Sequence, residues 1–372
     1  AAGSFRAIEL PPGDYRVTVQ AENFQTEIRE GIDLSAGRAA QVQFALEIGV
    51  QQQEVIVVAD AAPLSTRASD WGGVVHKEKL DSLPLNGRDL FELSILEPGA
   101  TAPPAARTGL AQGLGLQISV NGARPNQNGF QIDGVWVNDA TKSMPSSSAG
   151  SVLGLETVRE IHMVVNPYSA QYGRTAGGLF EAVSASGANR FHGALYEYFR
   201  NSSLDAKNFF DSPESPIPPL RRNQFGGVVS GPVVENRVWF LANYEGLRQR
   251  LGRPLRPTVP SLDARQGLLP GPDGGLEQIT VDPAAQPYVN LYPVPNGRDF
   301  GDGTAEAQRQ ASSSTDEDFL SGKVDVQITN AMRLATRYTF SDALNREPED
   351  MGIWTFQLGS RNHFFSSELQ TV

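Results

Sequence analysis

Few residues of this chain have the types and the spacing that catalysis or metal binding requires. The four histidines, at positions 76, 162, 192 and 363, are spread along the chain without metal-ligand spacing. The chain contains no cysteine, which excludes thiol catalysis, disulfide bonds and cysteine-based metal sites. Residues 299–302 are acidic and glycine-rich but lack the calcium-loop pattern. We therefore expect no enzymatic activity, no cofactor and no bound metal ion.

Two glycine motifs could suggest nucleotide binding or nucleophilic catalysis, and both fail on spacing. The Gly-x-Gly at residues 113–115 lacks the third glycine of a dinucleotide-binding loop and precedes a predicted strand. Residues 227–231 place their serine outside the central position of a nucleophile elbow, Gly-x-Ser-x-Gly, and no strand-to-helix turn is expected there. Neither motif supports an enzyme.

Composition narrows the class of protein further. The formal net charge is −11 and the pI is about 5.0, so the chain should repel a phosphate backbone and we expect no nucleic-acid partner. No run of about 18 apolar residues exists, which excludes a transmembrane helix but not a membrane β-barrel, whose strands give a weaker signal. The 37 glycines and 25 prolines favour a turn-rich β protein.

The second half of the chain shows long strands with a period of two. In one of them Val238, Phe240, Ala242 and Tyr244 fall on one face of the predicted strand. They alternate with Trp239, Leu241, Asn243 and Glu245 on the other face. The predicted strands are 191–200, 222–231, 237–246, 319–328, 332–341 and 362–372. Each is about as long as the 9–11 residues that a tilted barrel strand needs to cross the hydrocarbon layer.

The connections between these strands alternate in length. The predicted connections are 201–221, 232–236, 247–318, 329–331 and 342–361. A transmembrane barrel has short periplasmic turns and long extracellular loops, whereas a soluble amphipathic sheet does not need this alternation. The pattern therefore favours a membrane barrel with an irregular extracellular loop at 247–318. Because an open sheet edge is not tolerated in lipid, more strands must follow residue 372.

In this geometry the apolar set of side chains faces lipid and the charged set faces the lumen. Tyr338, Phe340, Phe240 and Tyr244 would then lie near the outer ends of their strands, where interfacial aromatic residues gather. The chain begins without a methionine and ends inside a predicted strand, so we expect a fragment of a longer protein.

The first half of the chain divides into three predicted regions. Residues 1–48 read as the C-terminal part of a β-sandwich, with one strand at Tyr15–Val19 and a later one at residues 42–46. Residues 49–70 read as a linker, and residues 71–190 as a compact α+β domain. In the latter we expect helices at 77–83 and 89–96 and strands at 118–120 and 131–137.

The linker contains one short β-branched segment, which ends before an Ala-Ala-Pro break. Its residues are Glu54, Val55, Ile56, Val57, Val58 and Ala59. Such a segment can add as a strand to the sheet edge of a partner. It can equally be one more strand of the first domain, and the residues alone leave both interpretations open.

Several ordered motifs of the 71–190 region resemble the plug of TonB-dependent outer-membrane receptors, in particular the Oar-like branch. The motif residues are Asn121, Gly122, Arg124, Asp133, Gly134, Tyr172, Gly173, Arg174, Gly177 and Gly178. Further segments similar to that branch are residues 82–88, 158–161, 189–193, 208–210, 282–286 and 291–296. The sequence departs from the family at residues 180–184, Phe-Glu-Ala-Val-Ser, where an Asn and a Lys are usual. Residues 1–48 resemble the end of a carboxypeptidase-regulatory-like domain.

The resemblance implies a mainly β protein of the outer membrane of a Gram-negative-type bacterium. It would comprise a partial β-sandwich in the periplasm, an α+β plug and the first six or so strands, residues 191–372, of an antiparallel transmembrane barrel of about 22 strands. The segment from Glu54 to Ala59 would be captured by a TonB-type energy-transducing protein of the periplasm. Outer-membrane lipid and a small-molecule, carbohydrate or peptide ligand would be the other partners.

Two features of the plug have both a functional and an ordinary interpretation. Asp133 and Gly134 are expected to form a tight turn rather than a ligand site. Arg124 and Arg174 could pair with acidic residues on the lumen wall, such as Glu197 or Glu245, or could simply be solvated.

The resemblance implies a transporter that binds a nutrient at the cell surface and imports it by energy-coupled rearrangement of the plug. The alternative is a barrel-anchored surface adhesion or interaction protein without active transport. A third hypothesis is a soluble secreted β protein that binds carbohydrate through the sandwich. Dependence on the proton gradient distinguishes the first two, and membrane insertion distinguishes both from the third.

Overall fold

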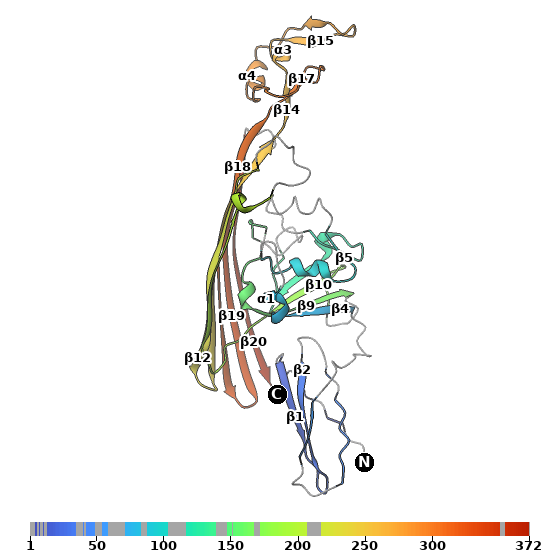
Figure 1. Cartoon of the computed structure of the whole chain (residues 1–372), viewed down its shortest axis with the longest axis vertical. Helices are drawn as coiled ribbons and strands as arrows, with labels where there is room; N and C mark the ends of the chain where they lie inside the picture. Colours follow the sequence, from blue (N-terminus) through green and yellow to red (C-terminus); the bar gives the residue numbers. More distant parts are fainter. Residues whose placement is uncertain are drawn as a thin grey trace.

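The chain forms three sheets that follow one another along the sequence and a small unit at one end of the longest sheet (Figure 1). The computed structural model describes residues 4–5, 7, 10, 13–34, 40, 42–48, 54–58, 71–82, 88–102, 117–138, 147–150, 152–166, 172–206, 217–349 and 354–371. Most of the described residues are in strands, as the sequence predicts for a mainly β protein.

The N-terminal sheet has three strands in the order β1-β2-β3. Strand β1 (Gly13–Val19) pairs antiparallel with β2 (Thr26–Leu34), and β3 (Glu54–Val58) pairs parallel with the other edge of β2. The segment predicted to add to a partner's sheet is therefore the edge strand of this sheet, apart from Ala59, which lies outside the described residues.

The strand predicted at residues 42–46 is wrong. Residues 42–48 are described and join no ladder; an isolated bridge links Phe24 to Ile48. The physical reason is that β3 occupies the edge of β2 that this segment would need. The segment is held instead by single bonds, from Gln25 N to Glu47 O (2.9 Å) and from Ala45 N to the Glu27 carboxylate (3.1 Å).

The middle sheet, which we call the plug sheet, lies beside the long strands (Figure 1). Its order is β4-β9-β10-β7-β8, and β10 pairs parallel with β7. Its strands are β4 (Trp71–His76), β7 (Gly129–Ile132), β8 (Val135–Trp136), β9 (Val158–Asn166) and β10 (Leu179–Ser184). A separate short pair joins β5 (Ala100–Thr101) to β6 (Ser119–Val120).

Helices around the plug sheet are short. They are α1 (Lys77–Ser82) and the 3₁₀ turns η1 (Glu92–Leu96), η2 (Pro125–Gln127) and η3 (Leu155–Thr157). The helix predicted over 89–96 is thus only a 3₁₀ turn, and the strand predicted over 131–137 is a hairpin of two strands. No helix in the described part of the chain is long and apolar enough to cross a membrane.

Aromatic side chains form the centre of the plug core. The ring of Phe130 lies edge-on to Phe91 at 5.0 Å and is stacked on Phe180 at 5.1 Å. All three are almost fully buried, as are Ile118 and Met163. Each such side chain contributes about 1.5–3 kcal/mol to folding when removed from water. The plug therefore has an apolar core of its own.

The third sheet, which we call the barrel sheet, has six antiparallel strands paired in sequence order. They are β11 (His192–Asn201), β12 (Leu220–Val234), β13 (Val238–Leu255), β18 (Arg309–Thr329), β19 (Met332–Pro348) and β20 (Thr355–Thr371). The turns after β12 and β18 are short, as predicted. A 3₁₀ turn, η4 (Ser202–Leu204), follows β11.

Five of these strands are longer than the sequence predicts. Strands β12, β13, β18, β19 and β20 have 15, 18, 21, 17 and 17 residues. Most of the predicted connection 342–361 is consequently strand. The prediction stopped where the outward face changes from apolar to charged, but the backbone ladder continues past that point because its hydrogen bonds do not depend on side-chain polarity.

The predicted irregular loop 247–318 is also wrong. Strands β13 and β18 remain paired up to Leu255 and Arg309, and residues 256–308 form a folded unit, the loop subdomain, beyond them (Figure 1). Its elements are β14 (Thr258–Pro260), α3 (Leu262–Arg265), β15 (Leu268–Pro270), β16 (Leu276–Gln278), α4 (Gln286–Val289) and β17 (Thr304–Glu306). Val259 and Ala305 are buried at its base.

The barrel sheet separates side chains strictly between two faces. On β13 and β18 the residues Leu241, Glu245 and Phe319 are buried toward the plug sheet, whereas the alternate residues Tyr244 and Leu320 are 40% and 47% exposed on the other face. This alternation is the one expected of a barrel wall with a filled lumen.

Candidate functional site at the plug–barrel interface

The plug contacts the barrel sheet first through the turn of the β7–β8 hairpin. Asp133 and Gly134 both have positive φ (47° and 74°), as the central residues of a type I′ hairpin turn require. The Asp133 carboxylate accepts hydrogen bonds from the Ser184 backbone N–H (2.8 Å) and hydroxyl (2.6 Å). It also accepts one from Arg337 Nη1 on β19 (2.9 Å). Lys323 on β18 donates to the Ser184 hydroxyl (2.9 Å).

This turn is therefore an electrostatic link between plug and wall. The Asp133 and Arg337 side chains are 17% and 6% exposed, so solvent screens their attraction only weakly. Burial opposes ionisation, but the charges of Arg337 and Lys323 and the Ser184 hydrogen bonds outweigh it and lower the pKa of Asp133. The carboxylate stays ionised in the assembled protein, and the link keeps its charge-assisted strength.

The second contact places plug backbone against a buried barrel carboxylate. The Gly154 N–H donates to Glu245 Oε2 on β13 (2.8 Å), and Gln224 on β12 donates to Oε1 (2.5 Å). Gly154 has φ +95°, and a Cβ there would lie 2.5 Å from the Phe319 ring. Leu153 packs beside it against Phe319. Only glycine allows the backbone to approach the wall this closely.

The third contact joins a plug loop to the last two strands. The Ser148 N–H donates to the Ser360 hydroxyl on β20 (2.7 Å), and the Ser148 hydroxyl donates to the Ala343 carbonyl on β19 (2.8 Å). Ser148 is 4% exposed. These are neutral hydrogen bonds between small side chains and backbone, which are worth about 1 kcal/mol each.

Charged and aromatic side chains make the fourth contact. Arg88 of the plug pairs with Glu156 (2.5 Å), which also accepts from Lys77 (3.3 Å). The Arg88 guanidinium lies 4.2 Å from the ring centre of Tyr198 and 5.6 Å from that of Tyr196, both on β11. This cation–π contact ties the start of the plug to the first barrel strand.

Asp89, next to Arg88, is a buried carboxyl of the plug that forms no ion pair with the described residues. It accepts from the backbone N–H groups of Phe91 (2.8 Å) and Val152 (3.4 Å). Burial raises the pKa of Asp89 to about 6, against the opposing effect of the Phe91 hydrogen bond. The protonation of this group therefore changes near neutral pH.

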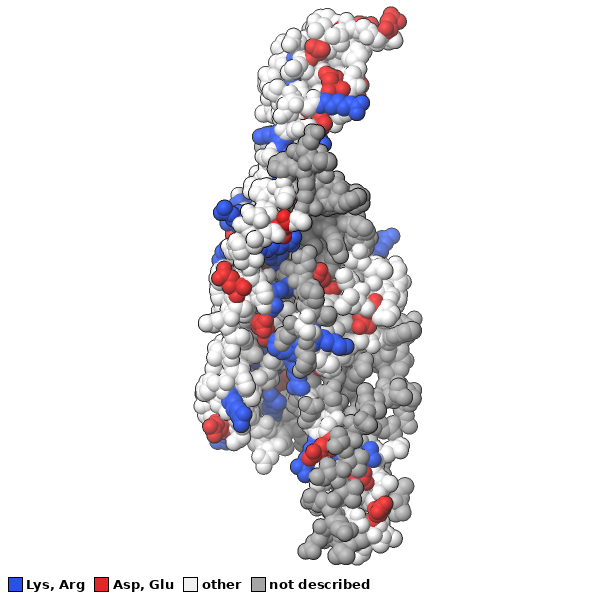
Figure 2. Space-filling model, viewed as in Figure 1, with Lys and Arg blue, Asp and Glu red and all other residues white. Residues whose placement is uncertain are grey.

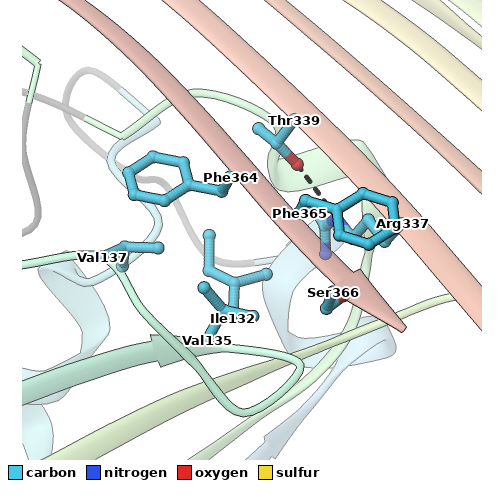
Figure 3. Close-up of a pocket in the computed structure, with 8 residues that line it drawn as sticks. All are labelled: Ile132, Val135, Val137, Arg337, Thr339, Phe364, Phe365 and Ser366. Atoms are coloured by element: carbon cyan, nitrogen blue, oxygen red, sulfur yellow. Dashed lines mark hydrogen bonds between the residues drawn. The ribbon is translucent and has the colours of Figure 1, made fainter. Parts of the chain in front are cut away.

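A small apolar crevice lies between the β7–β8 hairpin and strands β19 and β20 (Figure 3). It is lined by Ile132, Val135, Val137, Arg337, Thr339, Phe364, Phe365 and Ser366. Figure 3 shows the Phe364 ring beside Val137 and the Arg337 side chain bonded to Thr339. Phe364 also packs on the plug core. The crevice is a packing seam between plug and wall.

Three of the predicted motif residues, Asn121, Gly177 and Gly178, make hydrogen bonds within the plug. Asn121, in the turn with Gly122, donates from its side chain to the Val165 carbonyl (2.8 Å). The N–H groups of Gly177 and Gly178 donate to Gln127 O (2.9 Å) and to the Asn128 side chain (2.9 Å). Among the contacts between described residues, that of Asp133, supported by Gly134, reaches the barrel.

The pairings proposed for the two plug arginines do not form. Among the described residues, neither arginine has an ion pair with Glu197 or Glu245: Arg124 is exposed, and Arg174 lies 4.8 Å from the ring centre of Trp136. Glu197 is exposed, on the face away from the plug. At the hairpin turn the barrel wall supplies the cations, Arg337 and Lys323, and the plug supplies the carboxylate of Asp133. This charge arrangement is the reverse of the one expected for the plug arginines. Tyr172 is half-buried and Gly173 exposed beside Arg174.

Sequence reasoning missed the wall residues Lys323 and Arg337 and the plug residues Ser148 and Gly154. A signal existed for the first two, because both are charged and occupy the lumen-facing set of otherwise amphipathic strands. No sequence signal pointed to Ser148 or Gly154, which lie in or beside a serine-rich loop and contact the wall through backbone N–H groups and the Ser148 hydroxyl.

Comparison with known proteins agrees with this architecture. A family model described as outer membrane beta barrel domain matches residues 183–371, and one described as carboxypeptidase regulatory-like domain matches residues 1–47. The TonB-dependent transporter Oar of Myxococcus xanthus is 27% identical over 259 residues, which cover 66% of this chain and 23% of that protein. It is a transporter rather than an enzyme, as expected.

A solved structure has a similar fold. The outer membrane transporter YddB from Escherichia coli aligns with a TM-score of 0.53 and 11% identity, over 81% of this chain and 37% of that chain. The chain thus spans less than half the length of either protein. Since the barrel-domain match covers just over half of the residues, the chain belongs to the outer membrane beta barrel domain family, resembles the TonB-dependent transporters and lies in the outer membrane.

Proposed function

We propose that the chain is part of an outer-membrane transporter in which the plug is displaced by energy-coupled pulling, so that a nutrient bound outside enters the periplasm. The observation that carries this proposal is the chemistry of the plug–barrel interface. Apart from the Phe364 seam and the small Leu153–Phe319 contact, the contacts between the described parts of plug and barrel are hydrogen bonds, one ion pair and the cation–π contact of Arg88. Water can replace such bonds when the plug moves, whereas an apolar core could not be opened at similar cost.

Strand β3 is the proposed attachment point for a TonB-type partner. Among the described strands it pairs with β2 alone, since the sheet order is β1-β2-β3. Its other edge carries backbone groups to which an extended segment of the partner can add. The domain limits proposed from the sequence, 1–48, 49–70, 71–190 and 191–372, then describe a periplasmic sheet, a linker, a plug and a barrel segment, with β3 as the part of the linker that completes the sheet.

A disulfide between plug and wall tests the proposal. Because the chain has no cysteine, the pair Ser148→Cys and Ser360→Cys is the only thiol pair in this segment, and the two residues are joined by a 2.7 Å hydrogen bond. In the full-length protein in cells, we expect uptake to stop when the pair is oxidised and to return on reduction, with surface binding unchanged. Each single cysteine is the control. Uptake that continues with a formed disulfide would contradict a moving plug.

Replacement of Ile56 with Pro tests the partner strand. Proline removes a backbone donor from β3, so we expect loss of uptake with surface binding retained. The matched control is Ile56→Val, which keeps the backbone donor and the β-branched side chain. Full uptake in the proline variant would show that this segment is not the attachment point.

A barrel-anchored adhesion protein is the second candidate function. The loop subdomain favours it, because Tyr288, Leu291 and Val294 are 69%, 51% and 65% exposed on a folded extracellular unit. Removal of the proton gradient separates the two functions: adhesion continues without it and transport stops.

A further inference from the structure

The outward face of the barrel sheet changes character sharply along its strands. Phe225 on β12, Tyr244 on β13 and Phe340 on β19 are the outward aromatic residues nearest to the extracellular ends. From the periplasmic turns up to this level, the outward residues of β12, β13, β18, β19 and β20 carry no Asp, Glu, Lys or Arg. Aromatic girdles mark the boundary of the apolar band of a membrane barrel, so the outer-leaflet headgroups lie immediately above these residues.

Arginine is the main residue type just above this boundary on β12 and β13. Arg248 and Arg250 point outward from β13, and Arg221 points outward from β12 directly opposite Arg250. Figure 2 shows Lys and Arg gathered where the strands approach the loop subdomain. We call Arg221, Arg248 and Arg250 the arginine cluster.

Two of these arginines have acidic neighbours on β18. Arg248 makes two hydrogen bonds with Asp318 (2.7 and 2.9 Å), and Arg250 bonds Asp316 (2.8 Å). Their side chains remain 35% and 50% exposed. Arg221 is exposed, and no carboxylate pairs with it in the described part of the chain. The cluster thus has one more cation than the two carboxylates offset.

Like charges directly opposite each other on neighbouring strands destabilise a sheet. The backbones of Arg221 and Arg250 are about 5 Å apart, as register partners are. An anion held between the two guanidinium groups removes this repulsion. Guanidinium groups match phosphate oxygens with paired hydrogen bonds, so phosphate is the anion that this arrangement favours.

We propose that the arginine cluster binds a phosphate group on the headgroup of a phosphorylated glycolipid in the outer leaflet. The position of the arginine cluster favours a lipid headgroup as its ligand. The cluster lies on the lipid-facing side just above the aromatic boundary, where headgroups are present at high local concentration. The charge selects the phosphorylated form. This inference rests on the outer-membrane location of the chain and is independent of the transport mechanism.

Strand β13 offers a matched control three residues beyond Arg250. Arg253 faces the opposite side of the sheet, where it pairs with Glu347 on β19 (3.3 Å; 27% and 12% exposed). It has the same charge and a similar height but faces the lumen. Replacing it removes one positive charge, as each single replacement in the cluster does, without touching the lipid-facing side.

The test uses the full-length protein purified in detergent, with diphosphorylated lipid A as the probe and native mass spectrometry as the readout. Dephosphorylated lipid A is titrated in parallel, and inorganic phosphate is added as a competitor. The variants are Arg221→Gln with Arg250→Gln, and Arg253→Gln as the control. Heat-modifiable gel mobility verifies that each variant is folded.

We expect diphosphorylated lipid A to bind at least about tenfold more tightly than the dephosphorylated lipid, a difference of about 1.4 kcal/mol. The double variant should lose this preference and the Arg253→Gln variant should keep it. Equal binding of the two lipids, or a folded double variant that keeps the preference, would overturn the proposal. Complete displacement by millimolar inorganic phosphate would also overturn it, because the site would then be a general anion site.

Discussion

The interior of the plug and its contact with the barrel wall are built from different chemistry. Inside the plug, Phe91, Phe130 and Phe180 pack against one another in a buried core. At the wall, most contacts are polar and run through Asp133, Ser148 and the Gly154 backbone. Apolar packing there is limited to Phe364 and Phe319 among the described residues. The contrast indicates that the plug is a cohesive body whose attachment is separable from its folding.

The difference also assigns separate roles to neighbouring residues of one element. In the β7–β8 hairpin, Phe130 belongs to the core and Asp133, three residues later, to the wall contact. A change at one should alter the stability of the plug, and a change at the other should alter only its attachment. The four predictions below test this separation.

The largest effect is expected from Phe180→Ala. This change removes one of three stacked rings from a fully buried site and should destabilise the plug by about 3–5 kcal/mol. Protease resistance and thermal unfolding of the full-length protein in detergent measure it. The barrel strands should keep their heat-modifiable gel mobility. A plug that stays protease-resistant would mean that the wall, not the core, holds it together.

Breaking the ion pair between Asp133 and Arg337 should cost less free energy than Phe180→Ala and should weaken the attachment of the plug to the barrel wall. Arg337→Gln leaves Asp133 with Lys323 as the remaining nearby cation and should weaken plug–wall contact by about 2–3 kcal/mol. Hydrogen exchange should rise in the β7–β8 turn but not around Phe91. The matched control is Arg333→Gln, which breaks a wall pair with Asp325 (3.0 Å) away from the hairpin turn. Equal exchange changes in both variants would remove the special role of Asp133.

Asp89 should make plug stability depend on pH. Its folded pKa, about 6, is raised above the ordinary value, so its stabilising contribution is fully present below about pH 4 and is lost as the pH rises through about 6. The loss should be on the order of 2–3 kcal/mol. Hydrogen exchange around η1, corrected for intrinsic rates, measures it across this range. In Asp89→Asn the dependence should disappear; its persistence would assign the titration to another group.

The smallest effect is the difference in stability loss between alanine substitutions at two glycines with positive φ. Gly154→Ala combines backbone strain with a Cβ 2.5 Å from the Phe319 ring, whereas Gly122→Ala, at φ +78°, has no atom within 4 Å of the new Cβ. Strain alone should cost about 1–2 kcal/mol in both. The additional loss in Gly154→Ala, about 1 kcal/mol, reports the wall contact. Equal unfolding midpoints for the two variants would mean that the Phe319 ring moves away from the new Cβ without loss of stability.

The sequence was informative wherever a pattern was periodic or a turn was chemically marked. The alternation in 191–372 predicted all six barrel strands, and Asp133-Gly134 predicted the hairpin turn. The resemblance to TonB-dependent receptors is supported by the family and relative matches. These features depend on local residue order, which a single sequence contains in full.

The incorrect or missing predictions involve contacts and competition between segments that are distant in sequence. Residues 42–46 alternate as well as any strand, but β3 takes the edge of β2 that they would need. The outer ends of β13 and β18 look like loop because their outward residues are charged, although their ladder is continuous. The wall partner of Asp133 lies 204 residues away, so local pattern could not identify it.

The unbroken pairing of β13 with β18 has a consequence for what the cell surface presents. From Tyr244 to Leu255 the hairpin extends about 35 Å along the strand, or about 25 Å in height after the usual tilt of barrel strands. Every residue of this stretch has a register partner on β18, so the hairpin is a rigid support for the loop subdomain rather than a flexible linker. With the extracellular orientation expected from the sequence, the unit at its tip would meet approaching molecules above the lipid, before they reach the mouth of the barrel.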